Sequence, residues 1–91
     1  MNRESYLFPR ISEHDFPAFR DLLIEDAPDT YPGWLALMKR RRLVEMFHGY
    51  DVREIDVNPG EYIRFCGECG RKPNLKSLDD FVSEVASGRK F

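Results

Sequence analysis

Residues 58–88 read NPGEYIRFCGECGRKPNLKSLDDFVSEVASG, and this stretch carries the strongest local structure signals of the chain. Asn58 is a favoured helix-capping residue, and Pro59 fits the first helical position, where its missing N–H costs nothing. Glu61 can reach back to the N–H of the cap residue. The pattern predicts a helix over 59–69.

A second helix follows after a short turn. Gly70 is expected to end the first helix, and Asn74 to cap the next one. The apolar residues over 75–87 fall on one side of a helical wheel: Leu75, Leu78, Phe81, Val82, Val85 and Ala86. Two helices joined so closely are expected to pack as a hairpin.

Two further helices are predicted upstream. Ser12 is placed to cap a helix over 13–25, which has one apolar stripe. Thr30 is placed to cap a helix over 31–48, with a proline in its first turn and Gly49 as its stop. The stripe of the first of these helices consists of Phe16, Phe19, Leu22, Leu23 and Ala27.

The helix predicted over 31–48 changes its apolar side halfway along. Trp34, Leu35, Leu37 and Met38 face one way, whereas Leu43, Val44, Met46 and Phe47 face roughly the opposite way. Such a helix must pack on different neighbours at its two ends, or kink, and one neighbour can be a second protomer. The run Lys39-Arg40-Arg41-Arg42 separates the halves and forms a ring of charge, since successive residues are 100° apart.

One short strand is predicted over 51–57, from Val52, Ile55 and Val57. A single strand needs a partner, and two are available: the apolar segment 6–11, or the same strand of a second chain. The resulting fold class is mainly α, with four helices and one strand in a single small domain spanning 1–91.

Composition restricts the function further. The chain has 91 residues, of which 42% are hydrophobic and 13% aromatic, and this suits a packed core. No apolar run is long enough for a signal peptide or a membrane span, so we expect a cytoplasmic protein without membrane contact. The net charge of −2 is unlike that of a domain built to neutralise phosphates, so nucleic acid is a disfavoured partner.

Cys66 and Cys69 are the only cysteines, and their spacing is half of a zinc-knuckle pattern. His14 and His48, or the same pair of a second chain, are the available completing ligands. A redox pair is disfavoured, because the thiols lie near a helix C-terminus, where the dipole opposes thiolate formation. Buried packing of Cys66 is the favoured interpretation, and we therefore expect no cofactor. Zinc is the alternative.

The basic run offers other contacts. Arg41 falls within the first apolar side of its helix and Arg40 within the second, so each is a candidate for a buried ion pair or an interface contact. Lys39 and Arg42 complete a set of candidate anion or interface contacts, to which Tyr31, beside a Pro-Gly step, is added.

Three functional hypotheses remain. The favoured one is a small non-enzymatic protein-interaction domain that acts as a homodimer or binds another protein through the helix with two apolar sides and the strand edge. The alternatives are a zinc module through Cys66 and Cys69, and nucleic-acid binding through residues 39–42. An enzyme is least supported, since no nucleophile, base and orienting group can be assembled from the sequence.

Overall fold

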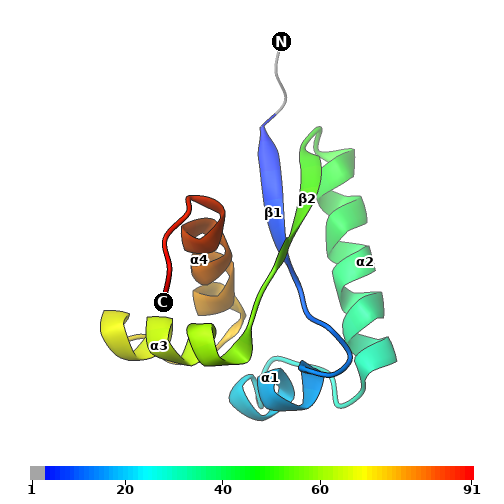
Figure 1. Ribbon diagram of the computed structural model, residues 1–91. Coiled ribbons are helices and arrows are strands. Elements are labelled where there is room, and N and C mark those ends of the chain that lie inside the picture. Colours follow the sequence, from blue (N-terminus) through cyan, green and yellow to red (C-terminus); the bar gives the residue numbers. More distant parts are fainter. Residues whose placement is uncertain (1–3) are drawn as a thin grey trace.

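The computed structural model describes residues 4–91, which form two strands and four helices (Figure 1). The prediction of a mainly helical domain with four helices is confirmed. The elements in chain order are β1 (Ser5–Arg10), α1 (Phe16–Leu22), α2 (Tyr31–Phe47), β2 (Asp51–Asp56), α3 (Pro59–Cys69) and α4 (Leu75–Ala86). Among these helices none is long and apolar enough to cross a membrane.

The two strands pair with each other in parallel. The register sets Ser5 opposite Asp51 and Arg10 opposite Asp56. The segment expected at 6–11 is thus a strand in its own right, and it pairs with 51–56 within one chain. At the end of the ladder the guanidinium of Arg10 donates to the carboxylate of Asp56 at 2.8 Å.

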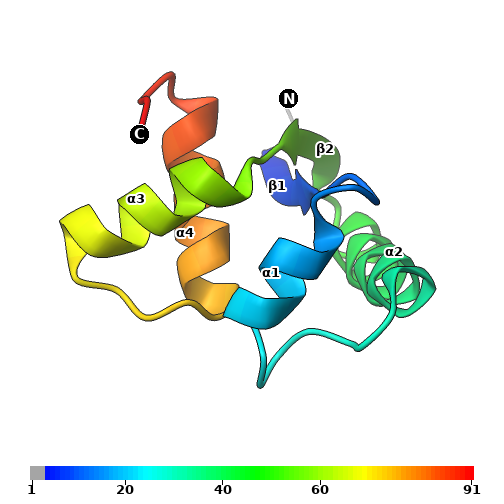
Figure 2. The ribbon, with the colours of Figure 1, turned by 60° about the horizontal axis from the view of Figure 1, so that its bottom comes forward.

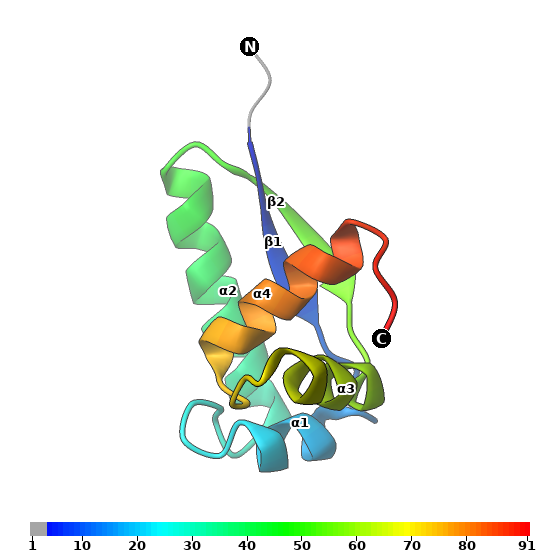
Figure 3. The ribbon, with the colours of Figure 1, turned by 90° about the vertical axis from the view of Figure 1, so that its left-hand side faces the viewer.

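The helices surround this small sheet. α2 lies on one side of the strands and α4 on the other, while α1 and α3 lie near the end where the strands finish (Figures 1 and 2). Seen from the side of α4, this helix crosses in front of the strands (Figure 3). α4 contacts mainly β1, and α2 contacts mainly β2. Parallel strands need a long crossover, which α1 and α2 provide here.

Aromatic side chains fill the space between the layers. The ring of Tyr62 lies 5.8 Å from Phe19 and 5.5 Å from Phe81, so one residue of α3 links α1 to α4. The largest side chains that are essentially inaccessible are Trp34, Tyr62, Phe8, Phe19 and Phe81. The stripe predicted for the first helix and most of the stripe predicted for α4 face this core, whereas Ala86 of α4 is exposed.

The predicted bounds of the first helix, 13–25, were too wide, because α1 spans only Phe16–Leu22. Ser12 does not cap it: its Oγ accepts a hydrogen bond at 3.1 Å from the backbone N–H of Asp15, within a preceding turn. Pro17 lies in the first turn of α1. A proline is tolerated there because the first N–H groups of a helix have no partner within the helix.

Candidate interaction surface

In the second half of α2, charged side chains face the interior of the domain and apolar side chains face the solvent, which is the reverse of the usual arrangement. In the first half, Trp34 and Met38 point into the core and are almost inaccessible. One and two turns later the same side of the helix carries Arg41 and Glu45. No residue of α2 after Met38 is buried, so charged side chains occupy the inward positions.

The contacts of Arg41 offset part of the free-energy cost of placing charged side chains on the inward side of α2. Its Nη2 donates to Oδ2 of Asp79 on α4 at 3.1 Å, and its guanidinium lies 5.5 Å from the centre of the Phe8 ring. Both charged side chains are about one third exposed, 27% for Arg41 and 32% for Asp79. Arg41, which the sequence offers as a candidate for a buried ion pair or an interface contact, thus forms a half-buried ion pair within the domain.

The pairing is incomplete. Nη1 of Arg41 and Oδ1 of Asp79 are buried and have no hydrogen-bond partner within the described residues. Burial raises the pKa of the Asp79 carboxyl above its ordinary value, and the attraction and hydrogen bond from Arg41 offset this only in part. The contact therefore fixes α2 against α4 with some cost in desolvation.

A second arginine ties the same part of α2 to the sheet. Nη1 of Arg42 lies 3.1 Å from Oε1 of Glu54 on β2. Together, Arg41 and Arg42 hold the second half of α2 in one rotational setting through charge contacts on its inner side.

The outer side of this half is apolar and open to solvent. Phe47 is 90% exposed, and its three apolar neighbours are each about half exposed. We define the apolar face of α2 as Leu43, Val44, Met46 and Phe47. Leu43 lies three positions before Met46 and four positions before Phe47, so the face covers adjoining turns of the helix. α2 lies at the margin of the domain with no other element beyond it (Figures 1 and 2).

A shallow hollow adjoins this face. It has a volume of about 180 Å³ and lies between β1 and α2, with walls formed by Tyr6, Phe8, Arg40, Arg41, Val44 and Glu45. Val44 and Arg40 thus belong both to the margin of the hollow and to the outer surface of α2.

The structure divides the basic run into two pairs. Arg41 and Arg42 point inward and are engaged by Asp79 and Glu54, as described above. Lys39 and Arg40 are exposed. Among the residues that the structure describes, Lys39 and Arg40 have no ionic partner, so these two cations of the run are the ones available to a partner.

The cysteines both lie on α3 and differ in environment. Cys66 is buried against the core, whereas Cys69 is exposed at the last helical position. His14 and His48 are exposed residues outside the regular part of α1 and α2. Between residues 4 and 91 there is no group of three or more His, Cys, Asp or Glu side chains placed to hold a metal.

Tyr31 has a structural position. Its hydroxyl donates to the backbone carbonyl of Ile11 at 2.8 Å, and its ring lies 5.5 Å from that of Phe16. These contacts fix the start of α2 beside the end of β1. The side chain is half-buried, so it contributes little free surface to a partner.

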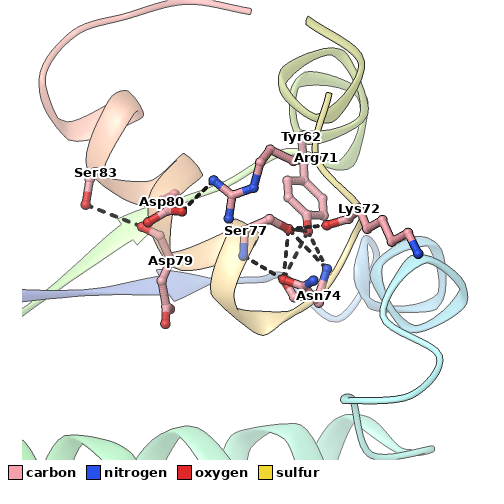
Figure 4. Close-up of polar contacts among 8 residues, drawn as sticks. All are labelled: Tyr62, Arg71, Lys72, Asn74, Ser77, Asp79, Asp80 and Ser83. Atoms are coloured by element: carbon pink, nitrogen blue, oxygen red, sulfur yellow. Dashed lines mark hydrogen bonds and ion pairs between the residues drawn. The ribbon is translucent and has the colours of Figure 1, made fainter. Parts of the chain in front are cut away.

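A buried polar cluster at the turn between α3 and α4 could not be inferred from the sequence (Figure 4). The hydroxyls of Tyr62 and Ser77 lie 2.7 Å apart, and Ser77 Oγ donates to the Lys72 carbonyl at 2.7 Å. Asn74 and Ser77 form a reciprocal capping box at the start of α4. Burial raises the pKa of Tyr62 to about 12, so this phenol stays protonated.

This cluster serves the fold. Ser77 is 0% exposed, and its oxygen is fully occupied by neighbours within the turn. Only the Asn74 cap carried a sequence signal. The partnership of Tyr62 with Ser77 depends on the packing of α3 on α4.

Comparisons with models of known protein families, with curated proteins and with solved structures found no match to this chain. The geometry of the domain is therefore the basis for its proposed function.

Proposed function

We propose that this chain is a non-enzymatic protein-interaction domain that forms a homodimer through the apolar face of α2. The observation that carries the proposal is the reversed polarity of this helix: Arg41 and Arg42 point inward while Leu43 and Phe47 point outward. Soluble domains normally show the opposite arrangement.

A monomer has no means of correcting this arrangement. Turning α2 about its axis to bury Phe47 would break the contacts of Arg41 and Arg42 and would expose Trp34 and Met38. Because the first half of the helix requires its present setting, no rotation of α2 against the described residues covers the apolar residues of its second half, and we propose that another molecule covers them.

A second copy is the occupant that we propose, because the face is apolar throughout and complementary to itself. Large apolar side chains present on the order of 150–200 Å² each when fully free, so the face offers roughly 400 Å² per protomer. Two copies then bury about 800 Å², before the stems of Lys39 and Arg40 are added. This is below the usual 1,200–2,000 Å² of stable complexes, so we expect a dissociation constant in the micromolar range, on the order of 1–100 µM.

The experiment is sedimentation equilibrium from about 1 to about 500 µM, a range chosen to bracket a micromolar constant. We expect a monomer–dimer equilibrium in the wild-type protein and a monomer in Phe47→Glu and Leu43→Glu. The matched control is Ile63→Glu, since Ile63 is an exposed apolar residue on a different helix. A wild-type protein that remains monomeric throughout, or a dimer that survives both substitutions on α2, would contradict the proposal.

The two alternative functions have less support. Nucleic-acid binding through 39–42 would rely on Lys39 and Arg40, since the other two cations are paired within the domain. Zinc binding would require Cys66 to leave the core. Native mass spectrometry of protein purified without chelator, and salt-dependent binding to generic DNA or RNA, test these alternatives directly.

A further inference from the structure

We propose that the two α2 helices of the dimer run antiparallel, so that Arg40 of each copy lies against Phe47 of the other. This inference rests on the proposed homodimer and adds its geometry and its polar contact. It starts from the order of residues along the exposed side of α2, where Ala36, Arg40, Leu43 and Phe47 are all exposed.

The spacing of these residues favours an antiparallel pair. Successive residues are 100° apart, so Ala36, Leu43, Phe47 and Arg40 lie within an arc of about 60°. A twofold axis that passes between the two helices, at the level midway between Leu43 and Val44, sets residue 40 of one copy opposite residue 47 of the other. The same axis brings Leu43 beside Leu43, and Val44 beside Val44, of the second copy. The leucines and valines nearest the axis then meet apolar residues of the other copy.

The charges also favour this direction. α2 has no basic residue in its last turn, so the partial negative charge of its terminal carbonyls is not balanced by a cation of that turn. In an antiparallel pair, Lys39 and Arg40 of each copy lie beside the C-terminal end of the other α2. In a parallel pair, the two C-terminal ends would lie together, and the cations of one copy would face those of the other.

Arg40 and Phe47 are suited to a direct contact. Phe47 is almost fully exposed, and Arg40 has no partner among the described residues. A guanidinium over an aromatic ring is a favourable pairing, worth about two- to five-fold in affinity at an exposed site. The symmetry of the dimer would produce this contact twice.

Disulfide trapping tests the direction. The background is Cys69→Ser, which removes the exposed native thiol and leaves buried Cys66. We expect Leu43→Cys to form a covalent dimer under mild oxidation, because the two residues meet at the axis. Ala36→Cys is the matched control: in the antiparallel pair its two copies are roughly 22 Å apart along the helix, too far for a disulfide.

Affinity measurements test the contact itself. For Arg40→Ala, Phe47→Ala and the double variant, we expect a coupling of about four- to twenty-five-fold in the dimer dissociation constant, because the contact occurs twice. A dimer that is trapped through residue 36, or through neither residue, or that shows no coupling, would overturn this inference while the homodimer stands. A wild-type protein that stays monomeric at all concentrations would overturn both.

Discussion

Arg41 of α2 and Asp79 of α4 are joined by a 3.1 Å contact between helices that lie on either side of the strands. This pair agrees with the rotation of α2 that buries Trp34 and Met38, because Arg41 can reach Asp79 only if its side of the helix points inward. The outward display of Leu43 and Phe47 is the consequence. Contacts within the domain therefore determine which residues of α2 are available to a partner.

Replacing only one member of this pair should destabilise the domain. In Arg41→Met, the carboxylate of Asp79 stays half-buried without its cation. We expect a loss of about 1–3 kcal/mol in the free energy of unfolding, less than for a fully buried pair because both groups are about one third exposed. Urea denaturation measures this loss. Arg64→Met on α3, which alters an exposed arginine, should change stability little.

The double variant Arg41→Met with Asp79→Leu supplies the check on cause. It removes both charges, so we expect it to recover most of the stability lost in Arg41→Met. A double variant as unstable as the single one would show that the stem of Arg41, packed on Phe8, matters more than its charge.

Asp79 should also make stability depend on pH in the acid range. Its pKa is raised in the folded state, chiefly by desolvation, so the folded protein holds this proton more tightly than the unfolded chain. The resulting stability is complete below the ordinary Asp value of about 3.9 and is lost as the pH rises through the folded value. We expect the free energy of unfolding of the wild type, relative to Asp79→Asn, to fall over that interval. Urea titrations at successive pH values measure this difference in the free energy of unfolding. A difference that rises with pH would contradict the prediction.

Ser77→Ala should weaken the junction of α3 and α4. The substitution leaves the Tyr62 hydroxyl and the Lys72 carbonyl without their shortest partner in a buried site. We expect a loss of about 1–3 kcal/mol on thermal or urea unfolding. Ser83→Ala, at an exposed position of the same helix, is the control and should cost much less. Equal losses in the two variants would argue against the cluster as a source of stability.

Two glycines of α3 should respond in opposite directions to alanine. Gly67 lies within the helix, and an added Cβ there would meet no atom within 4 Å, so Gly67→Ala should stabilise by about 0.5–1 kcal/mol. Gly70 closes the helix with φ +63°, which alanine adopts only with strain, so Gly70→Ala should destabilise by about 1 kcal/mol. The shift of each variant's denaturation midpoint from that of the wild type measures each effect. Shifts of the same sign would refute the assignment of the helix end.

Local signals predicted the secondary structure well where the chain carries caps and stops. α3 has the predicted bounds 59–69, and α2 and α4 each end one residue earlier than expected. The first helix was predicted too long because Ser12 resembles a cap, whereas its Oγ closes a separate turn before α1. The change of apolar side along α2 was also readable from the sequence, since it depends only on residue spacing.

The partners of those residues could not be predicted. Nothing in the spacing of the residues indicates that Arg41 would meet Asp79, 38 positions later. Nor does it indicate that the hydroxyl of Tyr62 would form a hydrogen bond with that of Ser77. Likewise, the sequence left open whether 51–57 would pair with 6–11 or with a second chain. Such contacts join residues that are distant along the chain, so they follow from the packing of whole elements.

The amino-acid sequence by itself determined the number of helices, the limits of α3, and those of α2 and α4 to within one residue, because caps, prolines and apolar spacing act over a few residues. The tertiary structure alone decided which side of α2 faces the solvent. That choice depends on Trp34 and Met38 entering the core while Arg41 and Arg42 reach carboxylates on α4 and β2. The exposed apolar face is the result of these long-range contacts, since only they fix the rotation of the helix.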